Sequence, residues 1–163
     1  MRRPALGTAL FFVLVPGVVA GLVPWLITGW DLESMPLGLR VVGGVLIAAG
    51  LPVLVHSFVR FVTEGRGTPA PVAPTERLVV GGLYRWVRNP MYVAVGSIIA
   101  GQALLFASPE LAIYLVLFAV AVATFVHGYE EPALRAQFGE EYEAYCHAVR
   151  AWVPRLRPWS AGD

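Results

Sequence analysis

Four long apolar segments dominate this sequence and leave little room for any other kind of fold. They run from Ala5 to Ile27, from Leu37 to Val62, from Met91 to Ala107 and from Leu111 to His127. A helix needs about 20 apolar residues to cross the hydrocarbon core of a bilayer. The first two segments exceed that length and the last two just reach it. The sequence therefore predicts an all-α integral membrane protein with four transmembrane helices.

The composition supports this class. Hydrophobic residues make up 57% of the chain and charged residues 14%, whereas soluble domains average about 45–50% and about 25%. Four spans with their connectors use most of the 163 residues, so residues 1–163 are expected to form one membrane domain. The single cysteine, Cys146, excludes an internal disulfide.

The positions of the arginines predict the orientation in the membrane. All 12 basic residues are arginine, and they gather before the first segment, around the second connector and after the fourth segment. The other two connectors carry Asp31, Glu33 and Glu110, with Arg40 alone at a border. Because basic loops stay in the cytoplasm, both termini should be cytoplasmic. The arginine-only composition is typical of a GC-rich bacterial genome, so we expect the bacterial inner membrane.

Two connecting regions flank the later segments. Residues 63–83 are rich in Gly and Pro, so this connector should be extended rather than helical. After the fourth segment, apolar residues recur at helical spacing, which predicts a cytoplasmic amphipathic tail. Gly139 is expected to break that tail into two pieces. The stripe consists of Leu134, Phe138, Tyr142, Tyr145, Val149 and Trp152.

Ionisable residues lie at the borders of the last two segments. Arg88 precedes the third segment, and Glu130 and Glu131 follow the fourth. A charged group near hydrocarbon is costly, at about 2.5–3.5 kcal/mol at a helix centre, and therefore tends to mark function. These residues predict a polar pocket for a charged cofactor at one end of a helical hairpin.

The same region resembles a known family. The pattern is Gly82-x-Tyr84-Arg85-x-Val87-Arg88-Asn89-Pro90-x-Tyr92, then Glu130-Glu131-x-x-Leu134, then Phe138-Gly139-x-x-Tyr142-x-x-Tyr145 and a late Pro154. It is similar to the isoprenylcysteine carboxyl methyltransferase family and, more distantly, to the phospholipid N-methyltransferases, as a bacterial-type member. The resemblance covers roughly the C-terminal half. Eukaryotic isoprenylcysteine methyltransferases usually have His at the position of Asn89, whereas Asn is common in the phospholipid enzymes and in bacterial relatives.

The resemblance implies a function. The implied activity is methyl transfer from S-adenosylmethionine to a lipophilic or membrane-embedded acceptor, such as a prenylcysteine-like carboxylate or another small or lipid nucleophile. The chain then divides into a helical hairpin (1–62), the connector (63–83) and a cofactor-binding region (84–163).

The chemistry of the cofactor assigns expected roles to particular residues. The guanidinium of Arg88 suits the cofactor carboxylate, and Glu130 and Glu131 suit its ammonium or ribose hydroxyls. Hydrogen bonds or a ring face near the sulfonium can come from Tyr84, Asn89 and Tyr92. Gly101-Gln102 resembles a small-plus-polar step of the family, although Gln102 can equally join two helices.

Two of these residues are also catalytic candidates. Arg88 can orient an anionic acceptor, and Glu131 can take the proton from an amine or thiol. A carboxylate acceptor needs no base. Small residues of the third segment admit either a side opening for the acceptor or close helix packing; they are Gly96, Ser97, Ala100 and Gly101.

The same residues are compatible with two other functions. Certain membrane sterol reductases share the C-terminal pattern but are much longer, and a non-catalytic lipid-binding protein is the third possibility. His127, Glu130 and Glu131 share one helical face, but no full set of metal ligands accompanies them apart from His56. We expect no metal site. No basic tract suggests a nucleic-acid partner.

Overall fold

The computed structural model describes residues 14–32, 34–65 and 76–160. Within these ranges every regular element is helical and none is a strand. The elements are η1 (Val18–Leu22), α2 (Val23–Thr28), α3 (Leu37–Gly65), η2 (Gly82–Arg85), α4 (Pro90–Leu105), α5 (Pro109–Phe125), η3 (Val126–Glu130), α6 (Glu131–Phe138) and α7 (Glu140–Ala148).

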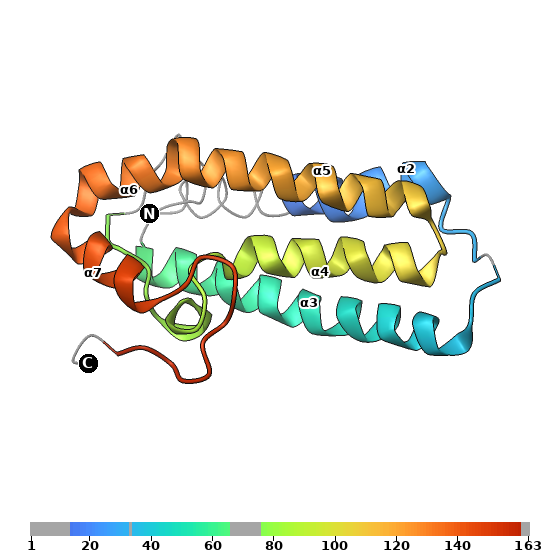
Figure 1. Ribbon diagram of the computed structural model, residues 1–163, viewed down its shortest axis with the longest axis horizontal. Coiled ribbons are helices and arrows are strands. Elements are labelled where there is room, and N and C mark those ends of the chain that lie inside the picture. The colour runs from blue at the N-terminus through green and yellow to red at the C-terminus, as the bar shows by residue number, and fades with distance from the viewer. Residues whose placement is uncertain (1–13, 33, 66–75, 161–163) are drawn as a thin grey trace.

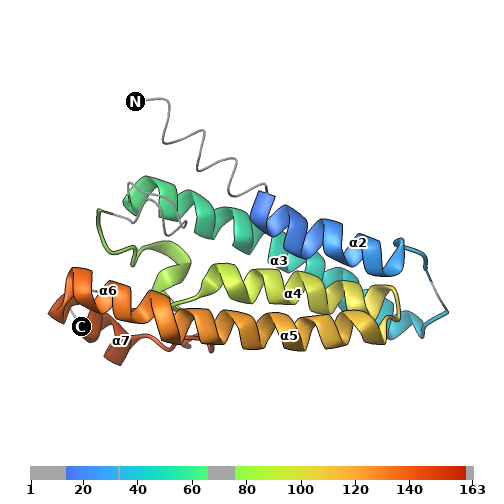
Figure 2. The ribbon, with the colours of Figure 1, turned by 90° about the horizontal axis from the view of Figure 1, so that it is seen from above.

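Four long helical rods form the body of the molecule. Residues Leu14–Thr28 form the first rod, α3 the second and α4 the third, and α5, η3 and α6 run on as the fourth, Pro109–Phe138. Figure 1 shows α6 continuing α5 at one end, where α7 and the C-terminal segment fold back. Figure 2 shows α3 crossing behind α4, while α4 and α5 run side by side. The four helices expected from the apolar segments are therefore present.

Two of these rods are long and apolar enough to cross a membrane: Leu37–Phe61 and Pro109–Phe138. Only 17% and 11% of their apolar windows are buried, so these helices expose hydrocarbon instead of enclosing it. Leu14–Thr28 and Pro90–Leu105 are apolar but shorter. The first expected segment begins at Ala5, and its residues before Leu14 lie outside the described ranges.

Glycines allow α3 and α4 to approach closely. A Cβ at Gly43 would lie 2.6 Å from the carbonyl oxygen of Gly101 and 2.9 Å from the amide nitrogen of Leu105. Further along, a Cβ at Gly50 would lie 3.0 Å from the carbonyl oxygen of Ala94. The backbones can touch there only because no side chain intervenes.

A proline in the first rod creates a second link between helices. Pro24 has no N–H, so it cannot bond the carbonyl of Ala20 one turn earlier. That carbonyl instead accepts a hydrogen bond of 2.7 Å from Nε2 of Gln102 on α4. The Tyr114 hydroxyl donates to the carbonyl of Val19 at 2.9 Å, within the π-helical turn. Neighbouring helices thus satisfy freed carbonyls, as expected for a proline inside a bundle.

The connector and the tail agree in part with the expectations. α3 continues through Thr63 to Gly65 and η2 begins at Gly82, so both edges of the expected connector are helical. Residues 66–75 lie outside the described ranges. The tail is broken as expected, because Gly139 has a φ of +53° between α6 and α7. The stripe residues Tyr142, Tyr145 and Val149 are buried against Leu78 and Val80.

We predict that Gly43→Ala destabilises the protein by about 1–3 kcal/mol, as overpacking of a tight contact does. Thermal unfolding in detergent measures this effect. Gly44→Ala is the matched control, because a Cβ at Gly44 meets nothing within 4 Å. Equal stability of the two variants would mean that α3 and α4 do not approach as closely as described.

Candidate functional site

Polar residues converge where η2, the start of α4, the end of the fourth rod and α7 meet. Pro90 begins α4. Proline is tolerated at this position because the backbone N–H groups of the first helical turn have no partner within the helix, so a missing N–H costs nothing there. Gly82 has a φ of +57°, and a Cβ there would lie 2.6 Å from Nε2 of His56. Glycine at this position therefore lets the chain turn tightly against α3 and present Tyr84 and Arg88 to the interior.

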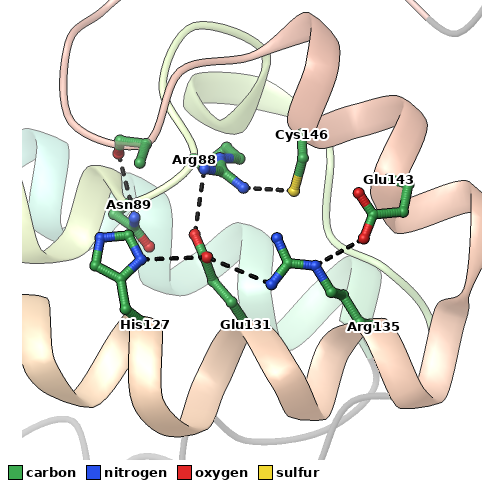
Figure 3. Close-up of polar contacts among 8 residues, drawn as sticks. Arg88, Asn89, His127, Glu131, Arg135, Glu143 and Cys146 are labelled. Carbon is green, nitrogen blue, oxygen red and sulfur yellow. Dashed lines mark hydrogen bonds and ion pairs between the residues drawn. The ribbon is translucent and has the colours of Figure 1, made fainter.

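A buried ion pair lies at the centre of this region. The guanidinium of Arg88 is 3.2 Å from Oε1 of Glu131, and the two side chains are only 14% and 9% exposed. The same guanidinium donates to the sulfur of Cys146 on α7. Figure 3 shows Arg88 lying between these two partners. Arg88 therefore joins the fourth rod to the C-terminal tail.

Glu131 contacts three basic side chains. Besides Arg88, its other oxygen lies 3.2 Å from Nδ1 of His127 and 3.7 Å from Arg135. Arg135 in turn pairs with Glu143 on α7 at 2.7 Å (Figure 3). This carboxylate is thus contacted by one group before it and one after it on its own rod and by one group opposite.

Two buried atoms in this cluster lack a hydrogen-bond partner. Within the described part of the chain, Nε of Arg88 and Oε1 of Glu131 make no hydrogen bond, although the two residues form an ion pair. Buried polar atoms are nearly always hydrogen-bonded. An unused donor beside an unused acceptor is a complementary arrangement for a ligand that carries both an anionic and a cationic group.

Glu130 has a different environment from its neighbour. Its Oε2 accepts a hydrogen bond of 3.0 Å from the hydroxyl of Tyr92 on α4. Glu130 ends the π-helical turn η3, and Pro132 follows in the first turn of α6. Single π-helical turns are frequent at functional sites. The two adjacent carboxylates thus serve separate partners.

The segment after α7 fixes the loop before α4. The amide of Arg88 donates to the carbonyl of Arg150 at 2.9 Å, and both the amide and the side chain of Asn89 donate to the carbonyl of Ala151 at 3.2 Å. The Tyr145 hydroxyl donates to the carbonyl of Tyr84 at 2.7 Å. Burial raises the pKa of the Tyr145 phenol, so it stays a neutral donor.

Two cavities adjoin this cluster. The larger has a volume of about 290 Å³, close to the lower end of ligand sites at about 300–1,000 Å³. Its apolar walls come from the first rod, α3, α4 and α5, and include Val19, Leu54, Phe58, Phe61, Val95, Phe118 and Phe125. Its polar end consists of Tyr84, Arg88, Asn89, Tyr92 and Glu130.

The smaller cavity has a volume of about 60 Å³ and lies toward the tail. Its lining includes Glu131, Tyr142 and Tyr145. It shares Phe61, Tyr84, Arg88, Asn89 and Glu130 with the larger cavity. These five residues therefore form a common wall between the two cavities, and the charged pair Arg88 and Glu131 borders the smaller one.

Six of the eight site residues expected from the sequence line these two cavities. Tyr84, Arg88, Asn89, Tyr92, Glu130 and Glu131 line one or both cavities. Gly101 and Gln102 do not: Gly101 faces Gly43 on α3, and Gln102 bonds the first rod. Of the two roles considered for Gln102, the structure places it in the helix contact.

The small residues of α4 form helix contacts as well. A Cβ at Gly96 would lie 3.8 Å from side-chain atoms of Leu115 and Phe118, and Gly101 adjoins α3. α4 faces the larger cavity through Met91, Tyr92 and Val95 instead.

The sequence gives no site role to Cys146, Tyr142, Tyr145 or the cavity phenylalanines. The sulfur of Cys146 nevertheless contacts the central guanidinium of Arg88. Tyr142 and Tyr145 belong both to the family pattern and to the apolar stripe of the tail, and this double occurrence is the sequence feature that could have indicated a site role. Among the described residues, no group of three His, Cys, Asp or Glu side chains is arranged to hold a metal ion.

Comparison with known proteins gives one family match. Residues 39–141, more than half of the chain, match the family model described as phospholipid methyltransferase. No curated protein matches the chain. The matched range includes α3, α4 and the fourth rod with both glutamates.

We predict that Glu131→Leu destabilises the protein by about 3–5 kcal/mol, because it leaves the buried guanidinium of Arg88 without its counter-ion. Adding Arg88→Met should recover part of that loss, and a double-mutant cycle of unfolding in detergent measures the coupling. The exposed pair is the control: Glu143→Gln should leave stability nearly unchanged, because its partner Arg135 is 44% exposed. Strictly additive losses at Arg88 and Glu131 would contradict a coupled pair.

Proposed function

Because the chain belongs to the phospholipid methyltransferase family, we propose that it transfers a methyl group from S-adenosylmethionine to a lipid acceptor in the membrane. The observation that carries this proposal is the shared wall of Phe61, Tyr84, Arg88, Asn89 and Glu130 between an apolar cavity and a smaller cavity that also borders the buried carboxylate of Glu131. A charged cofactor and a lipophilic acceptor need two such spaces that meet at a small number of residues.

The unpaired atoms support a site for the amino-acid end of the cofactor. Nε of Arg88 can donate to a carboxylate, and Oε1 of Glu131 can accept from an ammonium group. Both residues line the smaller cavity. We therefore assign Arg88 and Glu131 to cofactor binding, with His127 and Arg135 holding the Glu131 side chain in place.

The protein has to align the reactants and exclude water. When bound, the cofactor supplies an electrophilic methyl group on a positively charged sulfur. Tyr84, Asn89 and Tyr92 lie where they can orient this group toward the larger cavity. Alignment of two reactants in one site is worth about 7–11 kcal/mol in favourable cases. The phenylalanines around the larger cavity exclude water and can hold the alkyl chain of an acceptor.

We assign proton transfer to Glu130. The sequence favours Glu131 for this role, but Glu131 is already engaged by Arg88, His127 and Arg135. Glu130 accepts a hydrogen bond from the Tyr92 hydroxyl and lines the apolar cavity. A carboxylate in that position favours a cationic head group, so the preferred acceptor is a lipid amine. Glu130 would take a proton from its ammonium group. The freed nitrogen lone pair would then bond to the methyl carbon while the carbon–sulfur bond of the cofactor breaks and its electron pair stays on the sulfur.

We predict that the two glutamates separate cofactor binding from turnover. Arg88→Ala and Glu131→Gln should weaken cofactor binding by about 1.5–3 kcal/mol, the worth of a hydrogen bond to a charged group. Calorimetric titration in detergent, with no acceptor present, measures this. Glu130→Gln should bind the cofactor nearly as the unmodified protein does but lose about 10²–10⁴-fold in methylation rate of a lipid with a primary amine head group.

Several controls make this test decisive. Arg40→Ala removes an arginine from the far end of α3 and should change neither quantity. Tyr92→Phe, which removes the hydrogen bond to Glu130, should cause a smaller loss of rate than Glu130→Gln. Unchanged cofactor affinity in both Arg88→Ala and Glu131→Gln would reject the binding site. Methylation of a prenylcysteine carboxylate, but not of the amine, would reject the acceptor class.

We further propose that all four rods cross the bacterial inner membrane with both termini in the cytoplasm, as the arginine distribution indicates. The exposed apolar surface of α3 and α5 supports a lipid environment. The cofactor then reaches the site from the cytoplasm and the acceptor reaches it from the bilayer.

For this topology, a reporter fused at the C-terminus should indicate the cytoplasm and a reporter inserted in residues 29–36 the opposite side. Both reporters on one side would contradict the arrangement of four spans.

A further inference from the structure

The segment after α7 exposes an apolar tip between arginines. Leu156 is 98% exposed and Val153 is 56% exposed. Arg150 and Arg157, which flank them in the chain, are exposed as well. We call residues 153–157 the C-terminal loop. Leu156 forms the tip of this loop and is among the most exposed apolar side chains outside the long helical rods.

This loop is fixed on both sides of its tip. The amide of Arg155 donates to the carbonyl of Trp86 at 2.8 Å, and its guanidinium donates to the carbonyl of Ala148 at 2.7 Å. Further on, the amide of Trp159 donates to the carbonyl of Arg85 at 2.9 Å. Leu156 is therefore presented by an anchored backbone and is not a loose end.

The charges beside the tip are available to a partner. In the part of the chain that the structure covers, neither Arg150 nor Arg157 forms an ion pair with a carboxylate. The acidic residues of α7 lie in its first turn, at the opposite end from Arg150. The surface around Leu156 thus combines exposed hydrocarbon with unneutralised positive charge.

The loop also lies at the level where a membrane span ends. Phe61 is the last residue of the apolar rod Leu37–Phe61, and its ring lies 6.4 Å from the ring of Tyr84. Trp86 follows Tyr84 by two residues, its carbonyl accepts the hydrogen bond from the Arg155 amide, and it is 36% exposed. Figure 1 shows the C-terminal segment beside the end of the bundle that carries α7. The loop therefore lies near the end of a helix that is long and apolar enough to cross a membrane.

We propose that the C-terminal loop docks onto the anionic head-group layer of the membrane in which the protein sits. Leu156 and Val153 enter the acyl boundary, and Arg150 and Arg157 bind lipid phosphates and other anionic head groups. A second copy fits this surface less well, because a symmetric contact would bring the same arginines together. The proposal does not depend on methyl transfer.

Photocrosslinking in nanodiscs tests the proposal on the full chain. A benzophenone side chain replaces Leu156, and the discs contain either phosphatidylcholine alone or equal parts of phosphatidylcholine and phosphatidylglycerol. We expect a lipid adduct by mass spectrometry, with a higher yield in the anionic discs. Arg157→Gln should lower that yield about fivefold, the effect of one basic residue near an anionic surface.

The same probe at Glu141, an exposed residue in the first turn of α7, is the control and should give no lipid adduct. Thermal unfolding of each variant verifies the fold, and no change is expected because Leu156 and Arg157 have exposed side chains. Equal adduct yields in neutral and anionic discs, or at positions 156 and 141, would overturn the proposal. An adduct of double mass would overturn it in favour of a contact between two copies.

Discussion

The buried pair of Arg88 and Glu131 is the interaction on which the functional end of this protein depends. Two charges removed from water are tolerated only if each compensates the other. Arg88 lies just before α4, and Glu131 is the first residue of α6. The sulfur of Cys146 on α7 contacts the guanidinium of Arg88. The two contacts of this guanidinium thus join three parts of the chain, together with the backbone hydrogen bonds between the loop before α4 and the segment after α7, and Arg88 lines both cavities.

Much of the fold could be predicted because hydrophobic length is a local property of the sequence. The four apolar segments became four helical rods, and the break at Gly139 followed from the one residue type that readily adopts a positive φ. The ends of the helices were predicted less accurately than the helices themselves. The fourth rod continues to Phe138, because the charged residues after His127 remain helical while they pair with one another and with Arg88.

The residues of the site were predictable where charge is costly, and unpredictable where a role depends on which way a side chain points. Arg88, Glu130 and Glu131 stood out beside hydrocarbon. The sequence could not show that Glu130 and Glu131 have different partners, because the two carboxylates are adjacent in the chain. Gln102 shows the same limit: its partner, the Ala20 carbonyl, is freed by Pro24 in a distant helix.

The π-helical turn of Val126–Glu130 has a consequence for the register of the chain. A π turn holds one residue more than the regular helix, and each residue of an α-helix turns the following ones by about 100°. The wider turn absorbs this extra residue, so α5 and α6 continue as one rod. A helical periodicity counted at 100° per residue straight through residues 126–130 would therefore place the charged residues of α6 one position away from the face they occupy relative to α5.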